Sequence, residues 1–398
     1  MAESYKILGQ VAPSDTTEQV LYTAPASTQT IVTNITAVNR SGSSAIFDVN
    51  VYASAPNVAS VATPTFVVLG AGNTDAASST NGITWTTRTM PTGSYWYGAA
   101  YGNNTFVAVG NNSTSAASST DGITWTTRTL PANVSWQAMA YGNGVFSAIS
   151  QSTSAATSTD GITWTARTLP SSGSWQAMAY GNGLFVAVKY SSTGAASSTD
   201  GITWTARTLP SSKYWQAIAY GNGVFSAISQ SSPAASSTDG ITWTARTLSS
   251  SASWQAIAYG NGVFVTVAYG ATAAASSTDG ITWTARTLPA NDNWYSIAYG
   301  NGVFSAITNF SSNAASSTDG ITWTLRSLPF FSNWWSIAYG TPTIVYSSPA
   351  VNNVYKSATL QANASEVLEP GIVLGAGNTI VVKGTSNTTF SAYGVELS

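Results

Sequence analysis

The stretch that decides the fold runs from residue 215 to residue 247 and reads WQAIAYGNGVFSAISQSSPAASSTDGITWTART. It holds four short segments rich in β-branched and aromatic residues, which Gly, Asn, Asp, Ser and Pro separate. The pairs Asn222-Gly223 and Asp239-Gly240 supply the positive backbone φ angles that tight hairpin turns require. The stretch therefore predicts four antiparallel strands, at 215–220, 224–229, 234–238 and 241–247.

The same pattern recurs about every 40 residues. The phrase Gly-Ile-Thr-Trp-Thr occurs seven times, with its tryptophan at Trp85, Trp125, Trp164, Trp204, Trp243, Trp283 and Trp323. A second tryptophan opens each segment like Trp-Gln-Ala-Ile-Ala-Tyr, at Trp96, Trp136, Trp175, Trp215, Trp254, Trp294 and Trp334. Four-stranded repeats of this period are typical of propeller blades. We therefore expect an all-β fold in which residues 61–347 form a seven-bladed β-propeller, with both sets of tryptophans packed between blades.

The ends of the repeat region predict how the ring closes. The first unit, 66–88, has only the second, third and fourth strands, and the missing first strand stands at 334–339. We expect 334–339 to join 65–69 in one blade that both ends complete. A further segment at 343–347 resembles 65–69, which leaves the partner of 334–339 open.

The turn before each Gly-Ile-Thr-Trp phrase resembles a known motif. Ser237 to Trp243, Ser-Thr-Asp-Gly-Ile-Thr-Trp, is similar to the Asp-box of sialidase-like propellers, although that pattern has one residue between Asp and Gly. The resemblance implies a structural turn between the third and fourth strands. Its aspartates are Asp121, Asp160, Asp200, Asp239, Asp279 and Asp319, and Asn81 replaces the aspartate of the first box.

Residues 1–60 and 348–398 lie outside the repeats but are also strand-like. Together they are long enough for one β-sandwich, so we expect a single anchoring domain into which the propeller is inserted. The residues at 33–40, 47–49, 368–372 and 390–396 resemble sandwich modules of tailed-bacteriophage virion proteins. This resemblance implies a virion protein, made in the host cytoplasm without a signal peptide.

Composition excludes several classes of function. Lys and Arg number 13, Asp and Glu 15, and charged residues are 7% of the chain, against about 25% in an average soluble protein. Such a chain cannot carry the basic stripe of a nucleic-acid or anionic-membrane binder. The absence of Cys and His removes disulfides, Cys/His zinc sites and histidine-based triads. We expect no cofactor, no metal and no membrane insertion.

The distribution of acids predicts that the protein is not an enzyme. The five glutamates all lie in the flanks, at Glu3, Glu18, Glu366, Glu369 and Glu396. Inside the repeats the acids are the box aspartates, Asp75 and Asp292, and one arginine recurs in each unit. A catalytic site has to break the repeat symmetry, so we interpret these aspartates as turn caps. We expect the arginines to pair with them or with a neighbouring blade.

Differences between the repeats indicate where function lies. The two Gly-containing turns hardly vary, whereas the loops on the other face of a meander vary widely. The residue after the first-strand tryptophan is glutamine in four units, Gln137, Gln176, Gln216 and Gln255, and aromatic in three, Tyr97, Tyr295 and Trp335. With Phe330 and Phe331, these three form our candidate ligand-binding platform. If the ring closes as predicted above, these three units are neighbours. The alternative role of their aromatic residues is to repair packing where the ring closes.

We therefore expect a phage tail fibre or spike protein that presents its propeller to a glycan of the host surface. It would contact other virion proteins through the β-sandwich and act as a homo-oligomer. One alternative is a capsid or tail decoration protein that binds no receptor. The other is a cellular lectin or a degenerate glycosidase.

Overall fold

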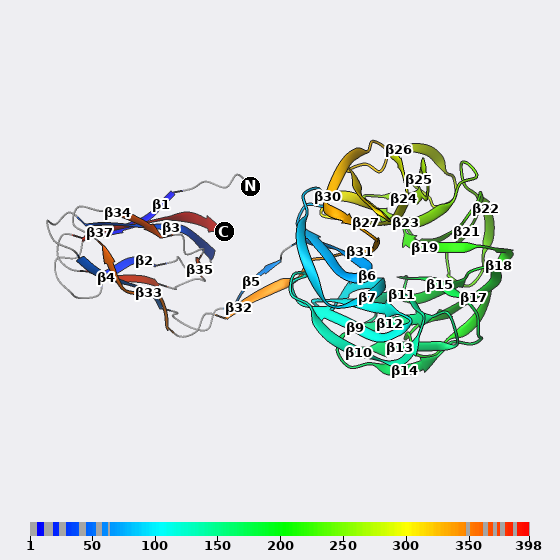
Figure 1. Ribbon diagram of the computed structural model, residues 1–398, viewed down its shortest axis with the longest axis horizontal. Coiled ribbons are helices and arrows are strands. Elements are labelled where there is room, and N and C mark those ends of the chain that lie inside the picture. The colour runs from blue at the N-terminus through cyan, green and yellow to red at the C-terminus, as the bar shows by residue number, and fades with distance from the viewer. Residues whose placement is uncertain are drawn as a thin grey trace. The chain divides into compact units, whose positions relative to one another are not determined.

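The computed structural model describes residues 64–342 throughout and, on either side, the backbone of strands β1–β5 and β32–β37 (Figure 1). The chain divides into two compact units, Met1–Val61 with Ile344–Ser398, and Ala62–Thr343. Glu3, Glu18 and Glu369 lie outside the described residues. Within the described part, no helix is long and apolar enough to cross a membrane.

The terminal unit contains two sheets, each built from N-terminal and C-terminal strands. One has the order β1-β37-β3-β34, with β35 also paired to β3, and comprises β1 (Lys6–Val11), β37 (Thr388–Leu397), β3 (Gln29–Asn39), β34 (Ser365–Leu368) and β35 (Ile372–Leu374). The other has the order β2-β36-β4-β33 and comprises β2 (Gln19–Thr23), β36 (Thr379–Gly384), β4 (Ala45–Tyr52) and β33 (Val351–Leu360). Each sheet combines strands from both ends of the chain. The structure shows these sheets but not the β-sandwich that the sequence predicts.

The second unit is a β-propeller, and five of its sheets are regular four-stranded meanders. Their inner strands are β11 (Trp136–Gly142), β15 (Trp175–Gly181), β19 (Trp215–Gly221), β23 (Trp254–Gly260) and β27 (Trp294–Gly300). The second strands are β12 (Val145–Ser150), β16 (Leu184–Lys189), β20 (Val224–Ser229), β24 (Val263–Ala268) and β28 (Val303–Thr308). The third strands are β13 (Ser154–Ser158), β17 (Ser192–Ser198), β21 (Pro233–Ser237), β25 (Ala271–Ser277) and β29 (Ser311–Ser317). The outer strands are β14 (Thr165–Thr168), β18 (Thr205–Lys213), β22 (Thr244–Thr247), β26 (Thr284–Asp292) and β30 (Thr324–Ser332).

The sixth sheet is larger and corrects the predicted count of seven blades. It has the order β10-β9-β8-β7-β6-β31 and comprises β10 (Thr126–Val134), β9 (Ser113–Ser119), β8 (Thr105–Asn111), β7 (Thr86–Gly102), β6 (Thr65–Ser79) and β31 (Trp334–Gly340). Strands β6 and β7 run for 15 and 17 residues, because backbone pairing of Ala71 with Tyr95 and of Asn73 with Ser94 joins pieces that are separate strands elsewhere. The propeller therefore has six sheets, and two sequence repeats share one of them.

Ring closure follows the predicted pairing. Strand β31 pairs with β6, with Trp334 opposite Gly70 and Tyr339 opposite Phe66. The segment that resembles 65–69 forms β32 (Thr343–Ser347). It pairs with β5 (Val58–Ala62) and not with β31. The first and last repeats are thus held together by strand hydrogen bonds.

A glycine at the end of each inner strand fixes the spacing between units. A Cβ atom added to Gly221 would lie 2.0 Å from Cγ of Tyr259 in the next unit. The same overlap recurs around the ring and ends with Gly340, in the unit that closes the ring, against Tyr101 of the following unit. Each of these tyrosines also packs on a phenylalanine of its own unit, as Tyr220 does on Phe225 with ring centroids 4.7 Å apart. The first-strand tryptophans are fully buried, as predicted for core packing.

The Asp-box forms the turn before each outer strand. In a representative box, Asp239 Oδ1 accepts hydrogen bonds from the backbone N–H groups of Ile241 and Thr242, both at 2.8 Å. Asn81 accepts the corresponding two bonds at 2.9 Å, so the turn needs a side-chain oxygen but not a charge. The arginine prediction was wrong: Arg246 Nε donates to Ser236 Oγ at 2.8 Å within its own unit, and the other six arginines of the repeats bond in the same way.

The glycine contact predicts a coupled loss of stability. In the parent, Gly221→Ala forces a methyl group into the Tyr259 ring and should lower the free energy of unfolding by about 3 kcal/mol. In a Tyr259→Ala background the same substitution should cost about 1 kcal/mol or less, because the obstructing ring is gone. Denaturant unfolding of the four proteins measures this difference, and an equal cost in both backgrounds contradicts the role of the contact.

The Asp-box predicts acid sensitivity. The backbone N–H donors of Thr242 and Ile241 lower the pKa of Asp239 to about 2. In the other five aspartate boxes burial raises the pKa, but hydrogen bonds from backbone and serine groups together lower it further than burial raises it. A carboxyl whose pKa is depressed on folding stabilises above its unfolded value of about 3.9, and that stability is lost as the pH falls toward 2.

Replacing all six box aspartates by asparagine should therefore flatten the pH dependence of the melting temperature between pH 5 and pH 2. The variant should stay folded at pH 7, because Asn81 already serves the first box. Thermal unfolding at pH 5, 3 and 2 compares the two proteins. Parallel curves would show that the boxes do not carry the acid sensitivity.

Candidate functional site

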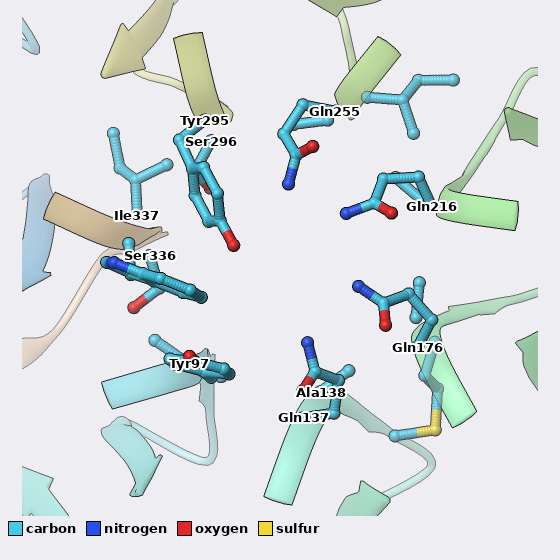
Figure 2. Close-up of a pocket in the computed structure, with 18 of the residues that line it drawn as sticks. Tyr97, Gln137, Ala138, Gln176, Gln216, Gln255, Tyr295, Ser296, Ser336 and Ile337 are labelled. Carbon is cyan, nitrogen blue, oxygen red and sulfur yellow. The ribbon is translucent and has the colours of Figure 1, made fainter. Parts of the chain in front are cut away.

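The predicted aromatic residues meet at the centre of the propeller. Tyr97 lies on β7, Tyr295 on β27 and Trp335 on β31, each directly after an inner-strand tryptophan. The four equivalent glutamines complete the lining. These seven side chains, the first ring, surround one central cavity. Figure 2 shows the labelled tyrosines on one side of the opening and the glutamine amides on the other. The ring order confirms that the three aromatic repeats are neighbours, since Trp335 contacts both tyrosines.

A β-bulge orients each of these side chains toward the cavity. In β11, Trp136 pairs with Ser150 and Ala138 pairs with Ile149, so that Gln137 between them has no partner across the ladder. The other inner strands have the same irregularity directly after their tryptophan. An extra residue in one strand bends the strand and re-aims the side chain. The repeated tryptophan thus anchors the strand in the core while the next residue faces the cavity.

A second ring of residues widens the cavity on one side. These residues follow the second strands or end them, and they are Asn111, Gln151, Tyr190, Gln230, Tyr269 and Asn309. All but Asn111 line a space of about 520 Å³ together with Phe310 and the residues of the first ring. In the sequence, the position after each second strand lies at the start of a variable loop, and none of these residues was predicted to belong to a site. The signal was present, because the position changes from unit to unit within an otherwise repeated phrase.

The aromatic side of the cavity is a chain of ring contacts, of which the Tyr97–Trp335 pair is stacked. Tyr97 lies parallel to Trp335, with ring centroids 3.9 Å apart and planes 10° from parallel. Tyr295 packs on the same indole at 4.6 Å and 50°, and Tyr269 packs against Tyr295 at 6.5 Å. Burial, with smaller contributions from Tyr97 and Tyr269, raises the pKa of Tyr295, and burial also raises that of Tyr97. Both hydroxyls are therefore neutral at physiological pH.

The opposite side is built from amides that pair between the two rings. Gln151 Nε2 donates to Gln137 Oε1 at 3.1 Å, and Gln230 Nε2 donates to Gln216 Oε1 at 3.3 Å. Tyr190 donates its hydroxyl to Gln230 Oε1 at 3.1 Å. None of the described residues that line the cavity is charged. In the part of the chain that the structure describes, no group of three or more acidic, Cys or His side chains could hold a metal ion.

Two of the predicted platform residues are not part of this cavity. Phe330 packs on the buried Trp334 with ring centroids 5.2 Å apart, and Phe331 is 69% exposed. Both lie on the outer strand β30, whereas the cavity is lined from the inner strands and the ends of the second strands. Phe330 and Phe331 are close to Trp335 in sequence, but they do not line the cavity with it.

Comparisons with known proteins identify the fold. No family model matches the chain, and no curated protein sequence matches it. The catalytically inactive virginiamycin B lyase from Staphylococcus aureus with quinupristin aligns with a TM-score of 0.56 at 13% identity, over 66% of this chain and 96% of that one. A streptogramin B lyase aligns with a TM-score of 0.54 at 14% identity, over 67% and 88%. YCF48 bound to a D1 peptide aligns with a TM-score of 0.49 at 17% identity, over 63% and 93%.

The similarities to the lyases show a β-propeller, and they correct the expectation that the protein is not an enzyme. The streptogramin B lyases are enzymes on this fold, so neither the fold nor the regular acids argue against catalysis. The cavity breaks the repeat symmetry at its lining, where Tyr97, Tyr295 and Trp335 replace glutamine. At 13–14% identity the likeness carries the fold and not the reaction.

The alternative role of the aromatic residues, packing at the ring closure, is tested by stability. The triple-glutamine variant, Tyr97→Gln with Tyr295→Gln and Trp335→Gln, places in all seven units the residue that four already carry. It should stay folded and lose about 2–6 kcal/mol, since it removes four aromatic contacts of about 0.5–1.5 kcal/mol each. Denaturant unfolding measures the loss, and a failure to fold would show that the aromatic stack holds the ring together.

Proposed function

We propose that this protein binds carbohydrate in the central cavity of its propeller. The observation that carries the proposal is the combination of a stacked aromatic wall and an amide wall around one uncharged cavity of about 520 Å³. The apolar C–H face of a sugar packs on aromatic rings, while its hydroxyl groups exchange hydrogen bonds with amides and tyrosines. Concave sites that combine aromatic side chains with a few polar groups are typical of small-ligand binding.

We further propose that the chain is a virion protein of a tailed phage, with the cavity presented to the host surface. The support is the resemblance of the flanking segments to phage sandwich modules, together with sheets that combine both ends of the chain. In this proposal residues 1–60 and 348–398 form a split β-sandwich that docks onto other virion proteins. Several copies on one particle would combine weak sites into avidity.

Although the propeller has six sheets, we propose that its seven repeats act as seven units toward the ligand. Seven inner-strand positions line the cavity, one from each repeat. The reaction of the structurally similar lyases is not part of the proposal. The lyase solved with quinupristin is inactivated by a histidine-to-alanine substitution, and the present chain contains no histidine.

Binding to intact host cells and to a glycan array tests the proposal, with the triple-glutamine variant beside the parent. The variant should lose at least about tenfold in affinity, because it lacks the aromatic wall but keeps the amides. Phe331→Ala is the matched control, since this aromatic residue is exposed and does not line the cavity. It should bind like the parent.

Two results would contradict the proposal. Equal binding by the parent and the triple-glutamine variant would move the site away from the cavity. No binding by the parent would favour a decoration protein that stabilises neighbouring shell subunits.

A further inference from the structure

The glutamine amides that line the cavity have defined orientations. These orientations bear on whether the cavity favours a donor or an acceptor group of a ligand. Figure 2 shows that Gln137, Gln176, Gln216 and Gln255 direct their amide nitrogens toward the centre of the opening. A primary amide carries two N–H donors on its nitrogen and acceptor lone pairs on its oxygen. The centre of the cavity therefore faces a set of convergent donors.

The orientation of Gln137 is fixed by a backbone group. Asn111 Nδ2 lies 3.1 Å from the carbonyl oxygen of Trp136, which can only accept, so this end of Asn111 is the donor. The same Nδ2 lies 3.4 Å from Gln137 Oε1, and Gln151 donates to that oxygen as well. With its oxygen occupied by two donors, Gln137 presents its NH₂ group to the cavity.

The same pattern recurs two units further around the ring. Gln230 donates to Gln216 Oε1, and Tyr190 donates to Gln230 Oε1. Gln216 is 8% exposed, so its amide is held in a packed environment. Second-ring side chains thus occupy the oxygens of two of the four first-ring glutamines, Gln137 and Gln216, and leave the nitrogens of these two toward the centre.

Convergent N–H groups favour an acceptor, and most strongly a charged one. Hydrogen bonds with an ionised partner are roughly twice as strong as bonds between neutral groups. Convergent backbone N–H groups bind anions without any positive side chain, and side-chain amides carry N–H donors of the same kind. No described residue that lines the cavity carries a negative charge that would repel such a group.

We infer that the cavity selects an acidic sugar, with the carboxylate of a uronic acid held by the glutamine nitrogens and its ring against the Tyr97–Trp335 stack. This inference rests on the proposed function and makes it more specific. It also accounts for the two-sided lining, because one wall contacts the apolar ring face and the other contacts the charged group.

Matched polymers test the inference. The parent should bind polygalacturonate at least about tenfold more tightly than fully methyl-esterified polygalacturonate, which keeps the sugar and removes the charge. The double variant Gln137→Glu with Gln216→Glu should lose this preference, because two carboxylates replace two of the donors at similar volume. Gln10→Glu, at an exposed position on β1, is the control for added charge and should keep it. Thermal unfolding checks that all proteins are folded.

The outcomes separate the inference from the proposed function. Equal binding of acid and ester, lost in the triple-glutamine variant, would overturn the inference and leave carbohydrate binding in place. If neither polymer binds, acetate is the probe, followed through the side-chain NH₂ resonances of the glutamines. Shifts in the parent that are absent from the double variant would support a carboxylate site without a sugar. No shifts would overturn the inference together with the proposed function.

Discussion

The propeller depends on one contact, the tyrosine ring of each unit against the glycine at the end of the preceding inner strand. The glycine has no Cβ, and any side chain there would occupy the ring's space, as the 2.0 Å distance from Gly221 to Tyr259 shows. This contact sets how closely neighbouring inner strands approach. Because it recurs around the ring and ends with Gly340 against Tyr101, it also brings the last repeat onto the first.

The cavity is a consequence of that packing. Once the inner strands stand at a fixed spacing, their tryptophans fill the core and the bulged residues after them face inward. The scaffold therefore accommodates different residues at the bulged position, which is glutamine in four units and aromatic in three. This freedom allows a symmetric fold to carry an asymmetric lining, with an aromatic wall on neighbouring repeats and an amide wall on the others.

The repeated charged residues lie apart from the cavity lining. The charged residues that repeat are the box aspartates and the strand arginines, and each is bonded inside its own unit. The cavity is lined by uncharged amides and aromatic faces instead. The second ring of side chains orients the first, since an amide whose oxygen is already bonded can offer only its nitrogen. The similarity to lyases shows that this fold also supports catalysis, which the regular acids alone had argued against.

The sequence by itself determined the four-stranded repeat, the turns and the pairing of 334–339 with 65–69, because these depend on local patterns and on counting. It also identified Tyr97, Tyr295 and Trp335 as neighbours, through the order of the repeats. Only the tertiary structure decided that the seven repeats share six sheets, since that depends on backbone pairing across β6 and β7. It alone separated Phe330 and Phe331 from the cavity and brought in Gln151, Tyr190 and Gln230. Residues near in sequence can lie on the outer strand of one sheet and the inner strand of the next, as Phe331 and Trp335 do, and residues of different repeats meet only when the ring has closed.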